Sequence, residues 1–211
     1  MGNKVVLGCL AAVLVVVLFT GMWAAGSYNK LNASEQAVNA GWAQVENVYQ
    51  RRADLIPNLV ETVKGAASFE KGTLEAVIQA RASATQTKLD PTSLKDPEAF
   101  ARFQKAQDGL SSALSRLLVT VEKYPELKAT QNFRELQAQL EGTENRISVE
   151  RGRFNQLTQT YNTLRRSFPA VIMANLAGFR ERPYFKATEG SEKPPAVKFS
   201  RADGTRPRRS F

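Results

Sequence analysis

The region that decides the fold is residues 28–63, YNKLNASEQAVNAGWAQVENVYQRRADLIPNLVETV. Apolar side chains recur along it at alternating intervals of three and four residues, and only Glu35 and Arg52 place polar groups in this row. A mean spacing of about 3.5 residues is typical of the buried face of helices that pack in bundles. The region is therefore predicted to be a long helix whose core face carries Tyr28, Leu31, Val38, Trp42, Val45, Tyr49, Ile56, Leu59 and Val63.

The same spacing returns in two later regions. Gln107 is the polar member of the first row, and Thr143 and Glu150 are the polar members of the second. A shorter helix is expected at about residues 73–88, and no segment shows the strict alternation of a half-buried strand. The apolar members of the two rows are Phe100, Phe103, Leu110, Leu114, Leu117, Val121 and Tyr124, and then Phe133, Leu136, Leu140, Ile147, Phe154, Leu157, Tyr161, Leu164 and Phe168.

Capping residues and prolines predict where these helices begin and end. Asp96 followed by Pro97 is a helix start, with a side-chain acceptor at the cap and proline in the first turn. Pro125 should end that helix, and the next is expected to begin between residues 125 and 132 and to run to about residue 167. Pro57 lies inside the first row, and an interior proline costs a helix about 3 kcal/mol. Because Asp54 could cap a restarted helix, a kink or break is predicted between Asp54 and Pro57.

The residues before this first row form a membrane segment. No charged residue stands between Lys4 and Lys30, and residues 5–25 read VVLGCLAAVLVVVLFTGMWAA. About 20 apolar residues suffice for a helix to cross roughly 30 Å of hydrocarbon. The predicted fold class is therefore all-α: an N-terminal transmembrane helix followed by an antiparallel up-down bundle of about four helices, two of them long. Since no glycine-proline linker follows Gly26, the anchor and the first core helix are expected to form one rod.

The expected domain plan has a flank at residues 1–4, a transmembrane helix at 5–26, a bundle at 27–185 and a basic tail at 186–211. A non-cleaved signal-anchor is favoured, because the apolar run is longer than the roughly 7–15 residues of a signal-peptide core. A cleaved signal peptide remains the alternative, since residues 24–26 are small. The apolar segment at residues 168–185 is expected to cover the bundle near the membrane or to lie against the bilayer surface.

Composition excludes several kinds of chemistry. The chain has no histidine and a single cysteine, Cys9, which removes Ser-His-Asp triads, Cys-His dyads and zinc sites that need histidine. No catalytic, cofactor-binding or metal-binding residues are predicted. The net charge of +9 is concentrated at the end of the chain, where residues 180–211 hold nine basic and four acidic residues. Such a tail can attract anionic lipid, but it is expected to be solvated, and nucleic acid is not an expected partner.

Residues 52–65, RADLIPNLVETVKG, resemble the RxDLIPNLVETVKG signature of the LemA family. The signature residues singled out are Asp54, Pro57, Asn58, Glu61, Lys64 and Gly65. The resemblance implies a bacterial membrane protein with an N-terminal anchor and an antiparallel helical bundle, and it supplies no catalytic residue. Residues 66–70, AASFE, differ from the Tyr-Ala-x-His-Glu that usually follows, so any role of that histidine is absent here. Further similar residues lie at 28–31, 42–45, 124–129, 132–133, 143–147, 161–162, 168–169 and 178–179.

Arg52 and Glu150 stand in the core rows of the first and last long helices, and they are predicted to form an ion pair across the core. In the alternative, both lie at the edge of the row and reach solvent by their long stems.

The predicted function is that of a non-enzymatic, membrane-anchored scaffold or adaptor of the bacterial cell envelope. Its expected partners are the lipid bilayer and a membrane protein, and self-association is left open. Lys4 before the span favours a single-pass inner-membrane protein with a cytoplasmic N-terminus and a periplasmic bundle. The alternative function is membrane remodelling or organelle assembly, in which the helices and the basic tail act on lipid.

Overall fold

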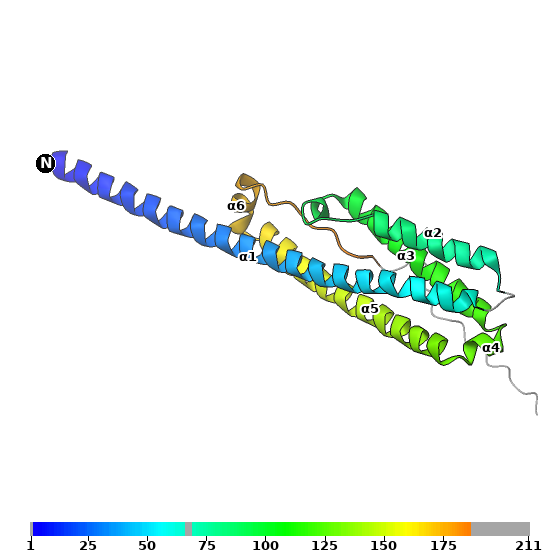
Figure 1. Ribbon diagram of the computed structural model, residues 1–211. Coiled ribbons are helices and arrows are strands. Elements are labelled where there is room, and N and C mark those ends of the chain that lie inside the picture. Colours follow the sequence, from blue (N-terminus) through cyan, green and yellow to red (C-terminus); the bar gives the residue numbers. More distant parts are fainter. Residues whose placement is uncertain (1, 66–68, 187–211) are drawn as a thin grey trace, which may run out of the picture.

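The computed structural model describes residues 2–65 and 69–186, and within these ranges it contains helices and their connections but no strand (Figure 1). The all-α prediction is confirmed. In chain order the elements are α1 (Gly2–Lys64), α2 (Lys71–Gln86), the short 3₁₀-helix η1 (Ser93–Lys95), α3 (Pro97–Val121), α4 (Pro125–Lys128), α5 (Gln131–Arg166) and α6 (Ala170–Leu176).

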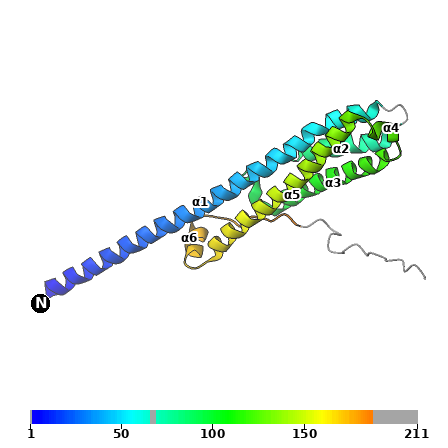
Figure 2. The ribbon, with the colours of Figure 1, turned by 90° about the horizontal axis from the view of Figure 1, so that it is seen from below.

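Four of these helices, α1, α2, α3 and α5, run up and down in an elongated bundle. The second half of α1 packs along α5, and α2 packs along α3 (Figures 1 and 2). The first part of α1 projects from one end of the bundle, and α6 lies at that same end. The end of the bundle that carries α6 is called the proximal end below, and the end that carries α4 is called the distal end.

The core consists of an aromatic proximal half and a largely aliphatic distal half. Trp42 lies at the centre of the proximal half, with its ring centroid 5.2 Å from that of Phe103 and 5.7 Å from that of Phe154. Ile56, Leu59 and similar side chains from α2, α3 and α5 fill the distal half.

The predicted core rows agree with this packing at most positions. The clearest exception is Phe168, which is 82 % exposed because it lies beyond the end of α5 at Arg166. Tyr28, the first residue of the row on α1, is 44 % exposed.

The predicted helix ends agree with the structure to within a few residues. The carboxylate of Asp96 accepts a hydrogen bond of 2.9 Å from the backbone N–H of Glu98 and so caps α3, which has Pro97 as its first residue. The hydroxyl of Thr130 caps α5 by accepting from the N–H of Phe133.

The prediction of a kink or break between Asp54 and Pro57 is wrong with respect to the break, because α1 is helical without interruption from Gly2 to Lys64. Pro57 has no N–H to donate to the carbonyl of Ala53, and this loss ordinarily makes an interior proline costly. Here the side chain of Arg81, on α2, donates from Nε to that carbonyl at 2.8 Å. The tertiary contact satisfies the acceptor that the proline leaves free, so the helix continues through it.

This explanation predicts a coupling between Arg81 and Pro57. Replacing Arg81 by methionine keeps much of the apolar stem but leaves the Ala53 carbonyl without its donor, so we expect the free energy of unfolding to fall by about 1–2 kcal/mol. In a Pro57→Ala background the new N–H bonds to that carbonyl, and the same substitution should cost less than about 0.5 kcal/mol. Chemical denaturation followed by circular dichroism measures both values. An equal cost in the two backgrounds would show that Arg81 acts through packing alone.

Candidate functional site

The first candidate site is the exposed N-terminal part of α1. Its large apolar side chains from Val6 to Met22 are between 59 % and 78 % exposed, and no other element of the described chain covers them. Side chains of this kind are expected in contact with hydrocarbon rather than water, since soluble proteins rarely expose such long apolar stretches. Among the described residues α1 is the one helix long and apolar enough to span a membrane, with a mean hydropathy of 2.5 in its most apolar window. It is the membrane anchor of the chain.

The anchor and the first bundle helix are one continuous element. Helix α1 contains 63 residues and passes through Gly26 without interruption, which confirms the prediction of a single rod. At about 1.5 Å of rise per residue, the rod is about 95 Å long. The bundle is therefore attached to the anchor by a helix rather than by a flexible linker.

The second candidate site is a polar network around Arg52, whose side chain is 1 % exposed. Its Nη1 donates to the Ser111 hydroxyl at 2.7 Å and to Oε2 of Glu144 at 2.9 Å. Its Nη2 donates to Oε1 of Gln107 at 2.6 Å and to the carbonyl of Gln107 at 3.3 Å. Arg52 thus joins α1 to α3 and α5 in the middle of the bundle.

The predicted ion pair between Arg52 and Glu150 is wrong, because the acidic partner of Arg52 is Glu144. Glu144 lies six residues before Glu150 on α5, which is about 9 Å along the helix axis. Oε2 of Glu150 is buried and has no hydrogen-bond partner within residues 2–65 and 69–186. Periodicity indicates which face of a helix is buried, but it does not set the register of two antiparallel helices, and the register decides this pairing. The alternative was that Arg52 lies at the edge of its row and reaches solvent by its long stem. The burial of its side chain contradicts that alternative for Arg52.

A second cation, the partly buried Arg151, lies next to this network. Its Nε donates to the Tyr49 hydroxyl at 2.5 Å, and its Nη2 donates to Asp108 at 3.0 Å. Burial raises the pKa of the Tyr49 hydroxyl, although the nearby Arg151 guanidinium acts in the opposite direction. Sequence reasoning missed Arg151 because it lies outside the apolar row of α5. The arrangement pairs two partly buried charges and links three helices, and the three side chains provide no free nucleophile.

The chain after α6 returns along the bundle as a non-helical segment, residues 179–186, called the strap below (Figure 1). Two asparagine side chains of α5 hold it. Asn162 donates to the carbonyl of Arg182 at 2.9 Å and accepts from its N–H at 3.0 Å. Asn155 makes the same pair of bonds with Phe185, at 3.0 Å and 2.9 Å. A run of seven helical residues is about 10 Å long, and so is a run of three extended residues. The distance between Asn155 and Asn162 on α5 therefore matches the distance between Arg182 and Phe185 in the strap.

Three strap side chains are buried in the core, those of Phe179, Arg182 and Phe185. Arg182 is 1 % exposed, and its guanidinium donates to Glu35 at 2.9 Å and to the carbonyl of Pro91 at 3.1 Å. The ring of Phe185 joins the aromatic half of the core, 4.8 Å from that of Phe100. The strap therefore closes the proximal half of the bundle. Residues 187–211, which contain most of the predicted basic tail, lie outside the described residues.

Loss of one asparagine should release the strap locally. Asn162→Leu leaves the buried N–H and carbonyl of Arg182 without partners, which we expect to cost about 2 kcal/mol or more. If opening of the strap accounts for this cost, hydrogen exchange of the Arg182 and Phe185 amides should be about thirty-fold faster. Asn145→Leu, at an exposed position on the same helix, is the matched control and should leave exchange unchanged. Unchanged exchange in Asn162→Leu would contradict the assigned role of this side chain.

The signature residues do not converge on a pocket. Asp54, Pro57, Asn58, Glu61, Lys64 and Gly65 are all exposed, and their spacing places them on one face of the distal part of α1. Asp54 accepts a hydrogen bond from Gln50, and Lys64 pairs with Glu61 at 2.8 Å. Neither interaction involves another element. This set of exposed residues is called the signature face below.

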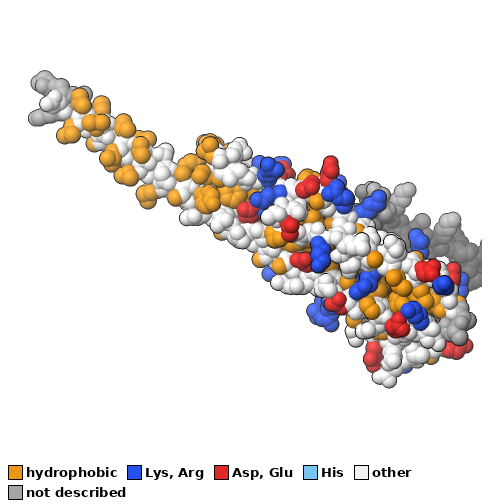
Figure 3. Space-filling view, turned by 45° about the horizontal axis from the view of Figure 1, so that its top comes forward, with side chains coloured by type: hydrophobic (Ala, Val, Ile, Leu, Met, Phe, Trp, Pro, Cys, Tyr) orange, Lys and Arg blue, Asp and Glu red, His pale blue; other side chains and the backbone are white. Residues whose placement is uncertain are grey.

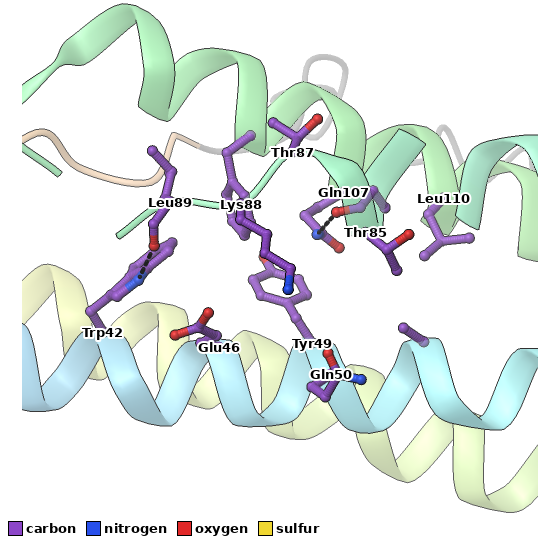
Figure 4. Close-up of a pocket in the computed structure, with 13 residues that line it drawn as sticks. Trp42, Glu46, Tyr49, Gln50, Thr85, Thr87, Lys88, Leu89, Gln107 and Leu110 are labelled. Atoms are coloured by element: carbon purple, nitrogen blue, oxygen red, sulfur yellow. Dashed lines mark hydrogen bonds between the residues drawn. The ribbon is translucent and has the colours of Figure 1, made fainter. Parts of the chain in front are cut away.

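A small cleft lies between α1 and the α2–α3 pair (Figure 4). Trp42, Glu46, Tyr49 and Lys88 are among its lining residues, and the Trp42 indole donates to the Leu89 carbonyl at 3.1 Å. Its volume is about 50 Å³, whereas cofactor and substrate pockets usually measure hundreds of Å³. The cleft is large enough for water only. In the described ranges, no three His, Cys, Asp or Glu side chains are grouped so that they could hold a metal ion.

The exposed apolar helix and the attached antiparallel bundle define a membrane-anchored helical-bundle protein. Comparison with protein families makes the assignment specific: the model of the LemA family matches residues 41–199, which is most of the chain. The chain belongs to the LemA family.

Named relatives include the magnetosome protein MamQ of Magnetospirillum gryphiswaldense and two MamQ proteins of Paramagnetospirillum magneticum. Each is 25 % identical to this chain over 183 residues, covering 79 % of this chain and 67 % of the relative.

Proposed function

We propose that this chain is a non-enzymatic adaptor or scaffold of the bacterial cell envelope, anchored in the inner membrane with its bundle in the periplasm. The observation that carries the proposal is the continuity of α1, whose exposed apolar end continues as a helix into the bundle. A rigid connection holds a protein surface at a fixed distance from the bilayer. Binding of a second membrane protein benefits from such a fixed distance, whereas turnover of a soluble substrate does not require it.

The signature face is the surface that we assign to this partner. Asn58 lies 33 residues beyond Ala25, the last residue of the apolar run, and thus about 50 Å from the end of the anchor. The polar side chains of this face make no contact that the bundle needs, because their hydrogen bonds and ion pairs stay within α1. Exposed acidic and amide groups on a rigid helix suit a polar interface with a partner protein.

Composition and the small cleft support a role without catalysis. The chain lacks histidine, and its one cysteine lies in the anchor. The cleft beside Tyr49, at about 50 Å³, is large enough for water only. We therefore assign no cofactor and no reaction, and nucleic acid is not a proposed partner.

The orientation is tested by fusions to Phe211. An alkaline phosphatase fusion should be active and a fluorescent-protein fusion dark, because the positive N-terminus favours the cytoplasm and places the rest of the chain outside it. The reverse pattern would contradict the periplasmic location.

The partner is tested by photo-cross-linking in cells. A photoreactive amino acid at Asn58 should give a discrete product with another membrane protein, and one at Val149, which is 67 % exposed on α5, should not. Asp54→Lys combined with Glu61→Lys should abolish the product. A product of twice the mass of the chain would identify a second copy as the partner. Absence of any product from Asn58 would contradict an adaptor that uses this face.

The second candidate function is remodelling of membranes, and the MamQ relatives favour it because they are magnetosome proteins by name. In this case the full chain in giant vesicles of anionic lipid should produce tubules or invaginations at high protein density. An adaptor should leave the vesicles spherical at the same density, so the vesicle shape separates the two functions.

A further inference from the structure

Helix α6 and the residue just before it expose three large apolar side chains, while Met173 of the same helix packs against the aromatic half of the core. Phe168, just before the helix, and Ile172 and Leu176 within it are four residues apart, and they are 82 %, 47 % and 79 % exposed. Ala170 and Ala174 on the other side are 8 % and 0 % exposed, where α6 packs against α1 and α5. Large apolar side chains on the outer side depart from the usual arrangement of a surface helix, in which such residues face the core. Phe168, Ile172 and Leu176 are called the α6 face below.

The α6 face lies at the level where α1 leaves the bundle. The ring of Tyr28 on α1 is 5.7 Å from that of Phe179, which follows α6 directly. Trp23 and Ala24 are partly buried, whereas residues 6–22 of the same helix are exposed. In Figure 3 apolar side chains gather beside α1 at this proximal end of the bundle, close to the apolar part of the anchor.

The distance from the anchor fits the membrane interface. Ala25 ends the apolar run, and Tyr28 lies three residues, or about 4.5 Å, further along α1. The headgroup layer on each side of the hydrocarbon is about 5–7 Å thick. A helix that packs beside Tyr28 is therefore at the boundary between headgroups and acyl chains, where amphipathic helices bind.

The charges at this end favour an anionic surface. Lys30 and Arg180 are exposed and have no carboxylate partner in the described part of the chain, whereas Arg166 pairs with Glu181 at 2.6 Å. Figure 3 shows Lys and Arg side chains, with Asp and Glu side chains among them, next to the apolar patch on the side toward the bundle. Apolar side chains toward the membrane with cations behind them match a bilayer that contains anionic phospholipid.

We propose that α6 is a second membrane contact, with the α6 face inserted into the interface of an anionic bilayer beside the anchor. A single helix leaves the bundle free to rotate about the axis of α1 and to tilt. A second contact off that axis restricts both motions and presents one chosen side of the bundle to its surroundings. This inference goes beyond the adaptor role and rests only on the membrane anchor.

Depth-dependent fluorescence quenching in nanodiscs tests the proposal with the full chain. In a Cys9→Ser background, a cysteine replaces Ile172 or Leu176 and carries an environment-sensitive dye. We expect a blue-shifted emission that is quenched at least two-fold by lipids with a spin label near the headgroup. The control is a cysteine at Val149, about 25 Å further along α5 from its C-terminal end, which should remain unquenched.

The composition of the bilayer and the nearby charges provide the second comparison. Quenching at position 172 should be stronger with anionic than with zwitterionic lipid, and Lys30→Gln with Arg180→Gln should remove this difference. Dye emission at positions 172 and 176 equal to that at 149 would overturn the proposal. A blue shift without lipid quenching would also overturn it, because it would show that protein covers the α6 face. Either result would leave the cross-linking test of the adaptor role unaffected.

Discussion

Replacement of Arg52 by alanine is expected to lower the free energy of unfolding of the full chain by about 3–5 kcal/mol. The substitution removes a large buried side chain and leaves a cavity between α1, α3 and α5. It also removes the donor to Oε1 of Gln107, a residue that is 5 % exposed. Glu144 is 54 % exposed and can be hydrated, so the lost charge pair accounts for little of the cost. Thermal and chemical unfolding in detergent, followed by circular dichroism, measures the change.

Three further variants separate the contributions to this effect. Arg52→Met keeps most of the volume and should cost about 1–3 kcal/mol, because the Gln107 amide still loses its donor. Glu144→Gln should cost less than about 1 kcal/mol, since solvent screens the pair. Glu150→Gln is the comparison on the same helix and should not lower stability, because Oε2 of Glu150 is buried without a partner and the substitution removes its charge. A larger loss for Glu150→Gln than for Glu144→Gln would contradict the register of α1 and α5 described above.

Local patterns in the sequence were sufficient to predict the helices and the all-α fold class. The rows through Trp42 and Phe154 identify the buried faces because each depends only on the geometry of its own helix. The cap at Asp96 is equally local, since the acceptor and the N–H of Glu98 are two residues apart. The continuity of α1 follows from the absence of a linker after Gly26.

The remaining features depend on contacts between distant residues, and the sequence pattern does not encode them. Helix α1 passes through Pro57 because the side chain of Arg81, 28 residues beyond Ala53, donates to the free carbonyl of Ala53. Arg52 finds Glu144 rather than Glu150 because the packing of whole helices sets their register.

The strap depends on such distant contacts as well. The seven-residue spacing of Asn155 and Asn162 is visible in the sequence, but their partners are backbone groups of a segment without periodicity. In the sequence Phe168 continues the apolar row of α5, but in the structure it lies past the end of that helix and belongs to the α6 face.

Two arginines at the centre of the anchor should abolish membrane integration. Residues 5–25 contain eleven Val, Leu and Phe residues, each favouring insertion by about 0.3–0.6 kcal/mol, which gives about 3–7 kcal/mol in total. One central arginine opposes insertion by about 2.5–3.5 kcal/mol and is tolerated. In the double variant Val15→Arg with Val16→Arg, the opposing contribution of about 5–7 kcal/mol matches or exceeds what the remaining apolar residues supply.

We therefore expect the double variant to leave the membrane fraction on alkaline carbonate extraction and to lose the activity of a phosphatase fused to Phe211. The bundle itself should stay folded, because residues 6–22 are exposed and do not contact its core. Val15→Leu with Val16→Leu is the matched control, and it should behave as the parent chain. If the arginine variant remained resistant to extraction, the segment would still be integrated in the bilayer, and the balance of insertion energies given above would be contradicted.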